Sequence, residues 1–386
     1  MTVIRGHIIR LDPTNKQATH FSKACGVARF TYNWALAQWK KQYEQDKNYR
    51  DECQVKGITI DENRLNKPSQ GKLRKQLNAI KREKYPFMLE VTKCSPQEAI
   101  IQLGKAFDNF FKGRAKYPQF RKKGINDKFS LTNDQFKLIG KKIKIPNLGW
   151  VKMRENLRFD GKILSATVFK KGSKWFVSIG VEIDNPPKLN AKTHKSVGID
   201  LGITDLATLS DGTKAQAPKP LKTKLKQLKR LSKQLSRKQK GSNNREKAKT
   251  KLSRLHYKIS CIRKDFLHKL TTNLVKQFDV ICIENLNVKG MVKNCKLARS
   301  IHDLGFYEFK RQLIYKANMQ GKTVKEVDRF YPSSKTCSSC GFVMAKENLT
   351  LATRLWTCPN CKASHDRDVN ASLNILNKAD KVLTLS

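Results

Sequence analysis

The sequence predicts a multidomain α+β protein, because three kinds of pattern follow one another along its 386 residues. From about Lys16 to Leu103, apolar residues recur at helical spacing in pieces that are interrupted near Gly57 and around Pro68 to Gly71. From Phe129 to Ile183, short runs rich in β-branched and aromatic residues alternate with glycine turns, which is typical of antiparallel strands. Beyond residue 188, apolar strand-like runs, strongly basic helical stretches and paired cysteines occur together. A chain of this length has room for about two or three domains.

The composition points to a polyanionic partner. Lys and Arg number 79 against 32 Asp and Glu, which gives a net charge of +47. This charge far exceeds what solubility requires, so nucleic acid is the natural partner. No apolar run approaches the roughly 18 residues that a membrane-spanning helix needs. Charges are interspersed from Arg5 onward, unlike a signal peptide, so we expect a cytosolic protein without a membrane partner.

The first half is expected to be a β-barrel with a helical region inserted into it. Residues 5–11 alternate as a strand does, and we expect this strand to join the β-type runs that begin at Phe129. Within the helical region, Ser95 is expected to cap a helix whose first position is Pro96. Gly113 is expected to end that helix.

A basic loop, residues 112–124, follows this helix. Tyr117 and Phe120 are interleaved there with Lys and Arg, a mixture that suits stacking on bases while holding phosphates. The alternative is a solvated loop with two packed rings. The candidate nucleic-acid contacts in this loop are Lys112, Arg114, Lys116, Tyr117 and Arg121.

The second half is expected to begin after a linker from Pro186 to Lys195. The next residues read as a strand, a tight turn at Gly202 and a second strand that ends in the turn S-D-G, so a hairpin is expected to carry Asp200. Residues 219–276 then hold 20 Lys and Arg and only two acids, with leucines at helical spacing interrupted near Gly241. A charged helical hairpin is usually just solvated, but a net charge of +18 over 58 residues favours phosphate contact. The candidate contacts are Lys229, Arg230, Arg237 and Lys238.

Widely spaced acids flank apolar runs in this half. Asp200 and Glu284 end strand-like runs, where packing explains a carboxylate poorly. Asp366 and Asp368 open an amphipathic helix, where simple helix capping is the alternative. The order of a strand Asp, a strand Glu and a late helical Asp is that of RNase H-type nucleases, whose acids hold two Mg²⁺ ions roughly 3.5–4 Å apart. The pattern therefore predicts metal-dependent phosphodiester chemistry, and spacing alone leaves the third acid open.

Four of the ten cysteines form two C-x-x-C pairs. Cys337 and Cys340 are separated by seventeen residues from Cys358 and Cys361, which is the spacing of a closed structural zinc ribbon. Four thiolates leave no open position, so this zinc is expected to fold a module and not to catalyse; His365 is an alternative ligand. The other six are expected to be buried small hydrophobes in a reducing cytosol, namely Cys25, Cys53, Cys94, Cys261, Cys282 and Cys295.

Several motifs in fixed order resemble one known family. G-I-D-L-G, I-E-N-L, Y-P-S-S-K-T-C-S-S-C-G, the second C-x-x-C and D-R-D-V-N-A-S-L-N-I are similar to the TnpB proteins of insertion sequences, which are relatives of type V CRISPR effectors. In the first half, A-F-D-N-F-F-K-G-R-A-K-Y-P-Q-F also resembles that family. The resemblance implies a transposon-encoded RNA-guided DNA endonuclease that cuts beside a short flanking motif at a single RuvC-like site.

The resemblance also implies residue roles, cofactors and partners. Asp200 would bridge two Mg²⁺ ions, for which Mn²⁺ is a substitute, and Glu284 and Asp368 would complete one site each. Asp368 is preferred to Asp366 because the family's acid stands two residues before an Asn, here Asn370. One structural Zn²⁺ is implied. The implied partners are a guide RNA from the transposon end and target double-stranded DNA with its displaced strand. The protein is expected to act as a monomer in the prokaryotic cytosol and to lie at the nucleoid when it is bound to DNA.

The implied domains combine these elements. A wedge β-barrel comprises residues 1–12 and 129–187, and a helical recognition region comprises 13–128. A RuvC-like, RNase H-like α/β nuclease domain comprises 188–330 and 364–386, including the basic hairpin 219–276. The zinc ribbon, a target-loading module, comprises 331–363. Two other functions stay open from the sequence: an RNA-guided DNA-binding regulator without cleavage, and a transposase.

Overall fold

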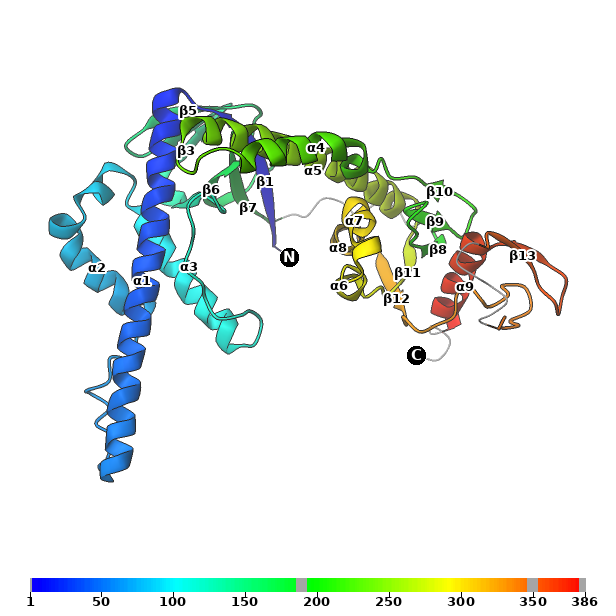
Figure 1. Cartoon of the computed structure of the whole chain (residues 1–386), viewed down its shortest axis with the longest axis horizontal. Coiled ribbons are helices and arrows are strands. Elements are labelled where there is room, and N and C mark those ends of the chain that lie inside the picture. Colours follow the sequence, from blue (N-terminus) through cyan, green and yellow to red (C-terminus); the bar gives the residue numbers. More distant parts are fainter. Residues whose placement is uncertain (1, 185–192, 346–352, 382–386) are drawn as a thin grey trace. The chain divides into compact units, whose positions relative to one another are not determined.

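The computed structural model describes residues 2–184, 193–345 and 353–381, which form two compact units (Figure 1). The units are Met1–Pro186 and Pro187–Ser386, so their boundary falls at the pair of prolines. Most of the predicted linker, residues 185–192, lies outside the described residues. Within the described ranges, no helix combines the length and the apolar character that crossing a membrane would require.

The first unit is built on a seven-stranded antiparallel sheet in the order β2-β6-β7-β1-β5-β4-β3. The first strand of the chain pairs with β7 along nearly its whole length and with β5 at its end, which confirms that it joins the later strands. Over the described residues no ladder joins β2 to β3, so the sheet is open where a closed barrel was expected. The strands are β1 (Val3–Asp12), β2 (Lys128–Thr132), β3 (Lys137–Ile139), β4 (Lys142–Ile145), β5 (Gly149–Met153), β6 (Lys162–Lys171) and β7 (Lys174–Ile183).

Helices fill the long connection between β1 and β2. They are α1 (Asn15–Lys56), α2 (Gln70–Lys84), the short 3₁₀ helix η1 (Pro86–Glu90) and α3 (Cys94–Phe111), with η2 (Asn133–Gln135) after β2. Helix α1 ends at Lys56, where the sequence predicted an interruption of the helical pattern near Gly57. Thr14 and Gln17 form a capping box at its start, and Gly57 ends it in the left-handed conformation. Phe21 of α1 packs against Phe129 and Trp175, which joins the helix to the sheet in one core.

The start of α3 corrects one expectation and its end confirms another. Ser95 is not the N-cap, because α3 begins one residue earlier and its N-cap position is Lys93. The buried Ser95 hydroxyl instead donates a hydrogen bond of 2.9 Å to the carbonyl oxygen of Ala24 in α1. The helix ends at Phe111, and Gly113 follows with φ of 66°, as predicted.

The second unit contains a five-stranded sheet in the order β10-β9-β8-β11-β12. Strands β8, β11 and β12 run parallel, and β8, β9 and β10 are antiparallel neighbours. The hairpin that carries Asp200 exists, but residues 201–206 join its strands in place of a tight turn at Gly202. The predicted S-D-G turn follows the second strand, with Gly212 between β9 and β10. The strands are β8 (Ser196–Asp200), β9 (Ala207–Leu209), β10 (Lys214–Ala215), β11 (Val280–Glu284) and β12 (Thr323–Val327).

Among the described residues of this unit, six helices and a small hairpin complete the fold. Helices α4 (Pro220–Ser236) and α5 (Asn243–Gln277) make up the basic hairpin, and Ser242 caps α5. The buried Asp303 accepts hydrogen bonds from the backbone N–H groups of Leu221 and Lys222, so it supplies the cap that the start of α4 lacks. The remaining elements are α6 (Val288–Met291), α7 (Cys295–Leu304), α8 (Phe306–Met319), β13 (Leu355–Thr357), β14 (Ser364–Asp366) and α9 (Arg367–Lys381).

Candidate functional site: three acids beside a cysteine cluster

Two of the predicted acids lie at the same edge of the second sheet. Asp200 is the last residue of β8, and Glu284 is the last residue of β11. These strands are parallel neighbours in which Ile199 pairs with Ile283. The two acids are the residues directly after this pair, so they lie next to each other at the ends of the strands. The strands are near-continuous apolar runs because both faces of the sheet are buried, and the acids come where that burial ends.

The third acid comes from α9, which packs against β8. Gly198 permits this packing: a Cβ atom there would overlap the carbonyl oxygen of Ser372 and would lie 2.8 Å from the backbone nitrogen of Leu376. Asp368 stands in the first turn of α9. Its charge acts directly on the carboxyl group of Asp200, so the fold brings residues together that are 168 positions apart in sequence.

The electrostatics of this group centre on Asp200. Burial raises the pKa of its carboxyl to about 7, and the negative charges of Asp368 and Glu284 add to that effect. Arg367 and the backbone N–H of Leu201 oppose it. Burial also raises the pKa of Glu284. Carboxylates with this environment bind divalent cations favourably, because a cation supplies the missing counter-charge.

Asp366 has a different set of contacts from Asp368. One of its carboxylate oxygens accepts hydrogen bonds from the backbone N–H groups of Asp368 and Val369, at 3.0 and 3.1 Å, so it caps α9. The other oxygen lies 2.7 Å from Nζ of Lys214 on β10. Burial acts in the opposite direction, but these hydrogen bonds hold the pKa of Asp366 below its usual value. Helix capping, which was the alternative to metal binding for both acids, is therefore the role of Asp366.

Arg354 is a residue of this site that the sequence analysis missed. Its guanidinium lies 3.3 Å from the carboxylate of Asp368 and 3.3 Å from the hydroxyl of Thr204. Lys214 was missed as well. Nothing in the sequence marks either cation, because basic residues are common throughout this chain and only the fold places these two beside the acids.

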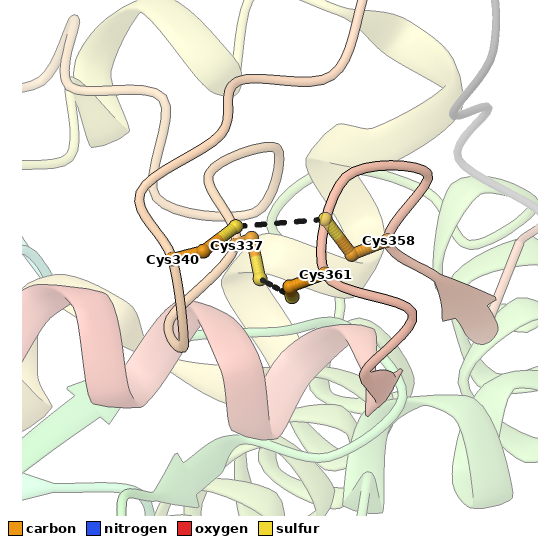
Figure 2. A group of neighbouring side chains, drawn as sticks. All are labelled: Cys337, Cys340, Cys358 and Cys361. Atoms are coloured by element: carbon orange, nitrogen blue, oxygen red, sulfur yellow. Dashed lines mark hydrogen bonds between the residues drawn. The ribbon is translucent and has the colours of Figure 1, made fainter.

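The four predicted cysteines converge on one point (Figure 2). All four sulfur atoms lie within 4.8 Å of one another, with 3.6 Å between Cys337 and Cys361 and 3.7 Å between Cys340 and Cys358. A disulfide requires about 2.05 Å, whereas four sulfurs at 2.3 Å from a central zinc would stand roughly 3.8 Å apart. The donor set fits a tetrahedral zinc ion. Among the described residues, no other group of three or more metal-ligating side chains has its ligand atoms within 4.8 Å of one another.

Hydrogen bonds from two residues of the cluster's surroundings favour a thiolate at Cys340. The backbone N–H of Phe342 donates to Cys340 and, with Asn360, lowers the pKa of its thiol to about 6. Nε2 of His365 lies 3.1 Å from the sulfur of Cys337, and its ring packs against Trp356. Of the six other cysteines, four are buried as expected; Cys261 and Cys295 are exposed, which corrects that expectation.

Two buried asparagines of α9 attach the cysteine module to the helix that carries Asp368. Asn370 donates to the carbonyl oxygen of Thr336 and accepts from the backbone N–H of Ser338, at 2.7 and 2.9 Å. Asn374, one turn later, donates to the carbonyl oxygens of Ser333 and Thr336. These contacts place the first cysteine knuckle directly on α9. The motif D-R-D-V-N-A-S-L-N contains both asparagines, but no pattern in the sequence marks Asn374 as a contact of the cysteine module.

The basic loop of the first unit is only partly available to a ligand. Tyr117 packs edge-on against Phe107 and Phe110, so the packed-ring alternative describes this residue. Arg121 lies over the ring of Tyr32 at 3.7 Å and donates to Gln102, so it has a structural role. The other predicted contacts are exposed: Lys112, Arg114, Lys116, Lys229, Arg230, Arg237 and Lys238.

Three family models match separate parts of the chain. Residues 178–295 match a family described as "Probable transposase" (OrfB_IS605), and residues 306–375 match "Cas12f1-like, TNB domain". Residues 1–48 match "Helix-turn-helix domain". Here that segment consists of strand β1 and the first part of the single helix α1, so its local fold differs from the description.

Curated relatives and a solved structure match nearly the whole chain. A Streptomyces pristinaespiralis protein is 36% identical over 383 residues, which cover 97% of this chain and 89% of the relative. InsQ of Escherichia coli K12 is 34% identical over 394 residues, covering 97% and 92%. Both are named "Putative RNA-guided DNA endonuclease". Mimivirus proteins named TnpB-like are 30% identical over 205 residues, covering 49% of this chain and 38% of the relative.

The structure titled "Cryo-EM structure of the Cas12f1-sgRNA-target DNA complex" has a chain with the same overall fold. Its TM-score is 0.54 and its sequence identity 14%, over 94% of this chain and 83% of that one. The relatives, the family models and the fold thus agree with the ordered motifs from G-I-D-L-G to D-R-D-V-N-A-S. The chain belongs to the TnpB family of insertion-sequence nucleases.

Proposed function

We propose that this protein is a transposon-encoded RNA-guided DNA endonuclease that hydrolyses target DNA at one site formed by Asp200, Glu284 and Asp368. The observation that carries the proposal is the shared location of these acids: two follow adjacent parallel strands, and the third acts electrostatically on the first. A guide RNA and a target DNA are the partners, in keeping with the names of the relatives and with a net charge of +47.

Each residue of the site has a distinct proposed role. Two bound Mg²⁺ ions, or Mn²⁺ in their place, would activate the attacking water and stabilise charge on the leaving oxygen. Asp200 is affected by both other acids, so it is suited to face both cations, while Glu284 and Asp368 each hold one side. Arg354 is placed to exchange its contact with Asp368 for a phosphate oxygen of the DNA. Asp366 keeps the start of α9 in position.

We assign domain roles on the same basis. The first unit supplies the wedge (1–12 and 129–187) and the recognition region (13–128) that read the flanking duplex, while base pairing with the guide reads the target sequence. The second unit supplies the nuclease domain (188–330 and 364–386). Its zinc ribbon, residues 331–363 with one structural Zn²⁺ on Cys337, Cys340, Cys358 and Cys361, delivers the target strand to the acids.

A plasmid-cleavage experiment with four proteins tests this function. The wild-type chain, expressed with its co-purifying RNA, is expected to cut a matched plasmid in Mg²⁺ but not in a chelator. Asp200→Ala and Asp368→Asn are expected to cut at least about 100-fold more slowly, because a metal ligand is lost. Asp366→Asn is the matched control: Asn caps helices about as well as Asp, so its rate should stay within a few-fold of the wild type.

The outcomes separate the alternatives. If Asp366→Asn cut as slowly as Asp200→Ala while Asp368→Asn kept full activity, the third acid would be Asp366 and not Asp368. Guide-dependent DNA binding without cutting in either metal would indicate a regulator. Joined transposon ends in place of cut target would indicate a transposase.

A further inference from the structure

One exposed side of the first unit's sheet carries lysines around a tryptophan. Strands β3, β4 and β5 end this sheet, and alternate residues on β4 and β5 are fully buried, as Ile143 and Val151 illustrate. The other residues of the three strands face away from the core. Ile139 is 65% exposed there, and Trp150 is 39% exposed. We call this surface the lysine–tryptophan face; it comprises Lys137, Ile139, Lys142, Lys144, Trp150 and Lys152.

The strand register places like charges opposite one another on this face. Lys137 pairs with Lys144 across β3 and β4, and Lys142 pairs with Lys152 across β4 and β5. Like charges directly opposite each other destabilise a sheet. Residues 137–154 contain six Lys and Arg and no acid. The free protein therefore carries a local repulsion that an anion of repeated charge would relieve.

No ion pair in the described part of the chain offsets this repulsion. The ion pairs found among the described residues include none of the four lysines of the face. The acid nearest in register is Asp12 of β1, which pairs with Lys152 along the ladder. Its carboxylate is already engaged by Arg10 and Arg154. The charge of the lysine–tryptophan face is thus left to solvent or to a partner.

Trp150 gives the face a stacking platform on a strand that is held to α1. Its carbonyl oxygen accepts a hydrogen bond of 2.9 Å from Nε2 of Gln17, which joins β5 to the first turn of α1. Lys144 is its direct cross-strand partner, and Lys152 lies on the same side of β5 two residues away. Lys142 is the diagonal neighbour, at roughly 7–8 Å in such a ladder. A base on the indole would thus have its flanking phosphates within reach of three ammonium groups.

We propose that the lysine–tryptophan face binds a single-stranded segment of the protein's RNA, with a base stacked on Trp150 and the adjacent phosphates on Lys142, Lys144 and Lys152. A duplex hides its base faces, whereas an open strand presents them to an aromatic residue on a flat sheet. RNA is favoured over DNA because the guide accompanies the protein before any target is met, so only RNA relieves the repulsion in the resting complex. This inference rests on the proposed function because it needs the bound RNA, but it does not need DNA cleavage.

Photocrosslinking of the assembled complex tests the identity of the strand. The full chain with its co-purifying RNA and a matched DNA is irradiated, and the peptide that contains Trp150 is analysed by mass spectrometry. A ribonucleotide adduct on this peptide is expected. A deoxyribonucleotide adduct in its place, or no adduct while other tryptophans react, would overturn the proposal.

Variants of the face test the charge contribution with single-stranded 12-nucleotide oligouridylate as the probe. The triple variant Lys142→Gln, Lys144→Gln, Lys152→Gln should bind roughly 10–100-fold more weakly and reduce the slope of log affinity against log salt by about two. The matched control removes the same charge from exposed positions of α1, with Lys41→Gln, Lys47→Gln and Lys56→Gln. An equal loss in both triple variants would show that only overall charge matters and would refute the proposal.

Further readouts separate binding from folding and from cleavage. Because the repulsion is removed, the triple variant should melt at the same temperature as the wild type or higher. Trp150→Leu should weaken oligouridylate binding roughly ten-fold, and Trp150→Phe should retain most of it. Asp200→Ala should leave the adduct unchanged. If the protein cuts DNA but gives no ribonucleotide adduct at Trp150, only the RNA-binding proposal is contradicted. If it gives the adduct but does not cut DNA, only the proposed function is contradicted.

Discussion

Asp200 combines burial with two like-charged neighbours, and this combination has a consequence for stability. Its pKa of about 7 in the folded chain stands well above the value near 3.9 of an unfolded Asp. The folded state therefore binds a proton more tightly than the unfolded state does. Between about pH 4 and pH 7 the cation-free protein loses stability as the pH rises, at up to about 1.4 kcal/mol for each unit.

Asp200→Asn should remove this pH dependence. Without divalent cations, the variant should be more stable than the wild type at pH 8 by a few kcal/mol, and nearly equal to it at pH 4. Urea unfolding across this range measures the difference. Mg²⁺ should stabilise the wild type at pH 8 and have little effect on the variant. Asp211→Asn, in the exposed turn after β9, is the control; parallel pH curves for Asp200→Asn and the wild type would contradict the prediction.

At this scale the sequence predicted the acids and the cysteines but not their choice of partners. Asp366 and Asp368 share one motif, and only the structure distinguishes them. Asp366 accepts hydrogen bonds from the backbone N–H groups that begin α9, whereas Asp368 acts on Asp200. Tyr117 is the opposite case, in which the sequence suggested a nucleic-acid contact and the fold packs the side chain. A ring in a basic loop fits stacking on a base, yet two phenylalanines of α3 already cover it.

Between elements, the packing of α9 against β8 brings Asp368 near enough to act electrostatically on Asp200. The approach is so close that position 198 has no space for a side chain. Gly198 lies two residues before Asp200 on β8, and its contacts with α9 are at Ser372 and Leu376. This glycine is required by close approach of two backbones and not by an unusual φ angle.

Gly198→Ala should therefore impair both folding and cleavage. The added methyl group must displace α9, at a cost of about 1–3 kcal/mol or more, and Asp368 moves with that helix. Gly6→Ala is the matched control, because a Cβ there meets no atom within 4 Å. Thermal melting and plasmid cleavage measure the two effects. Unchanged cleavage by Gly198→Ala would show that α9 does not position the third acid.

Patterns along the chain predicted the kinds of element better than their extents. The strand run before Asp200 and the basic helices were visible because apolar periodicity marks them. The turn at Gly202 was wrong, since Gly202 lies within the longer loop 201–206. The end of α1 was predictable, because the helical pattern is interrupted near Gly57, which follows its last residue.

Across the whole molecule, a division into two units was predictable from the proline pair and the change of pattern beyond it. The parallel order β8-β11-β12 was not, because strands far apart in sequence pair through contacts that no local pattern records. The expected barrel illustrates the same limit: alternation predicts a half-buried strand, but it does not tell whether the first and last strands of a sheet meet.

Zinc removal should affect one part of the molecule and spare the rest. Cys340→Ser should reduce the metal content from about one zinc per chain to near zero, because a tetrahedral site loses a ligand. Cys295→Ser changes an exposed cysteine outside the cluster and should keep its zinc. Hydrogen exchange should rise in residues 331–345 and in the first turns of α9, while α1 stays protected. Equal exchange increases in α1 would contradict a local role.

The junction of β14 and α9 has a consequence for regulation. Strand β14 ends at Asp366 and α9 begins at Arg367, so no spacer separates the cysteine module from the helix that carries Asp368. Asn370 and Asn374 join the two again from the side. A displacement of the module must therefore move the third acid. Under the proposed function, a DNA strand held by the module and cations held by the acids are allosteric effectors of each other, and each changes the other's affinity by the same factor.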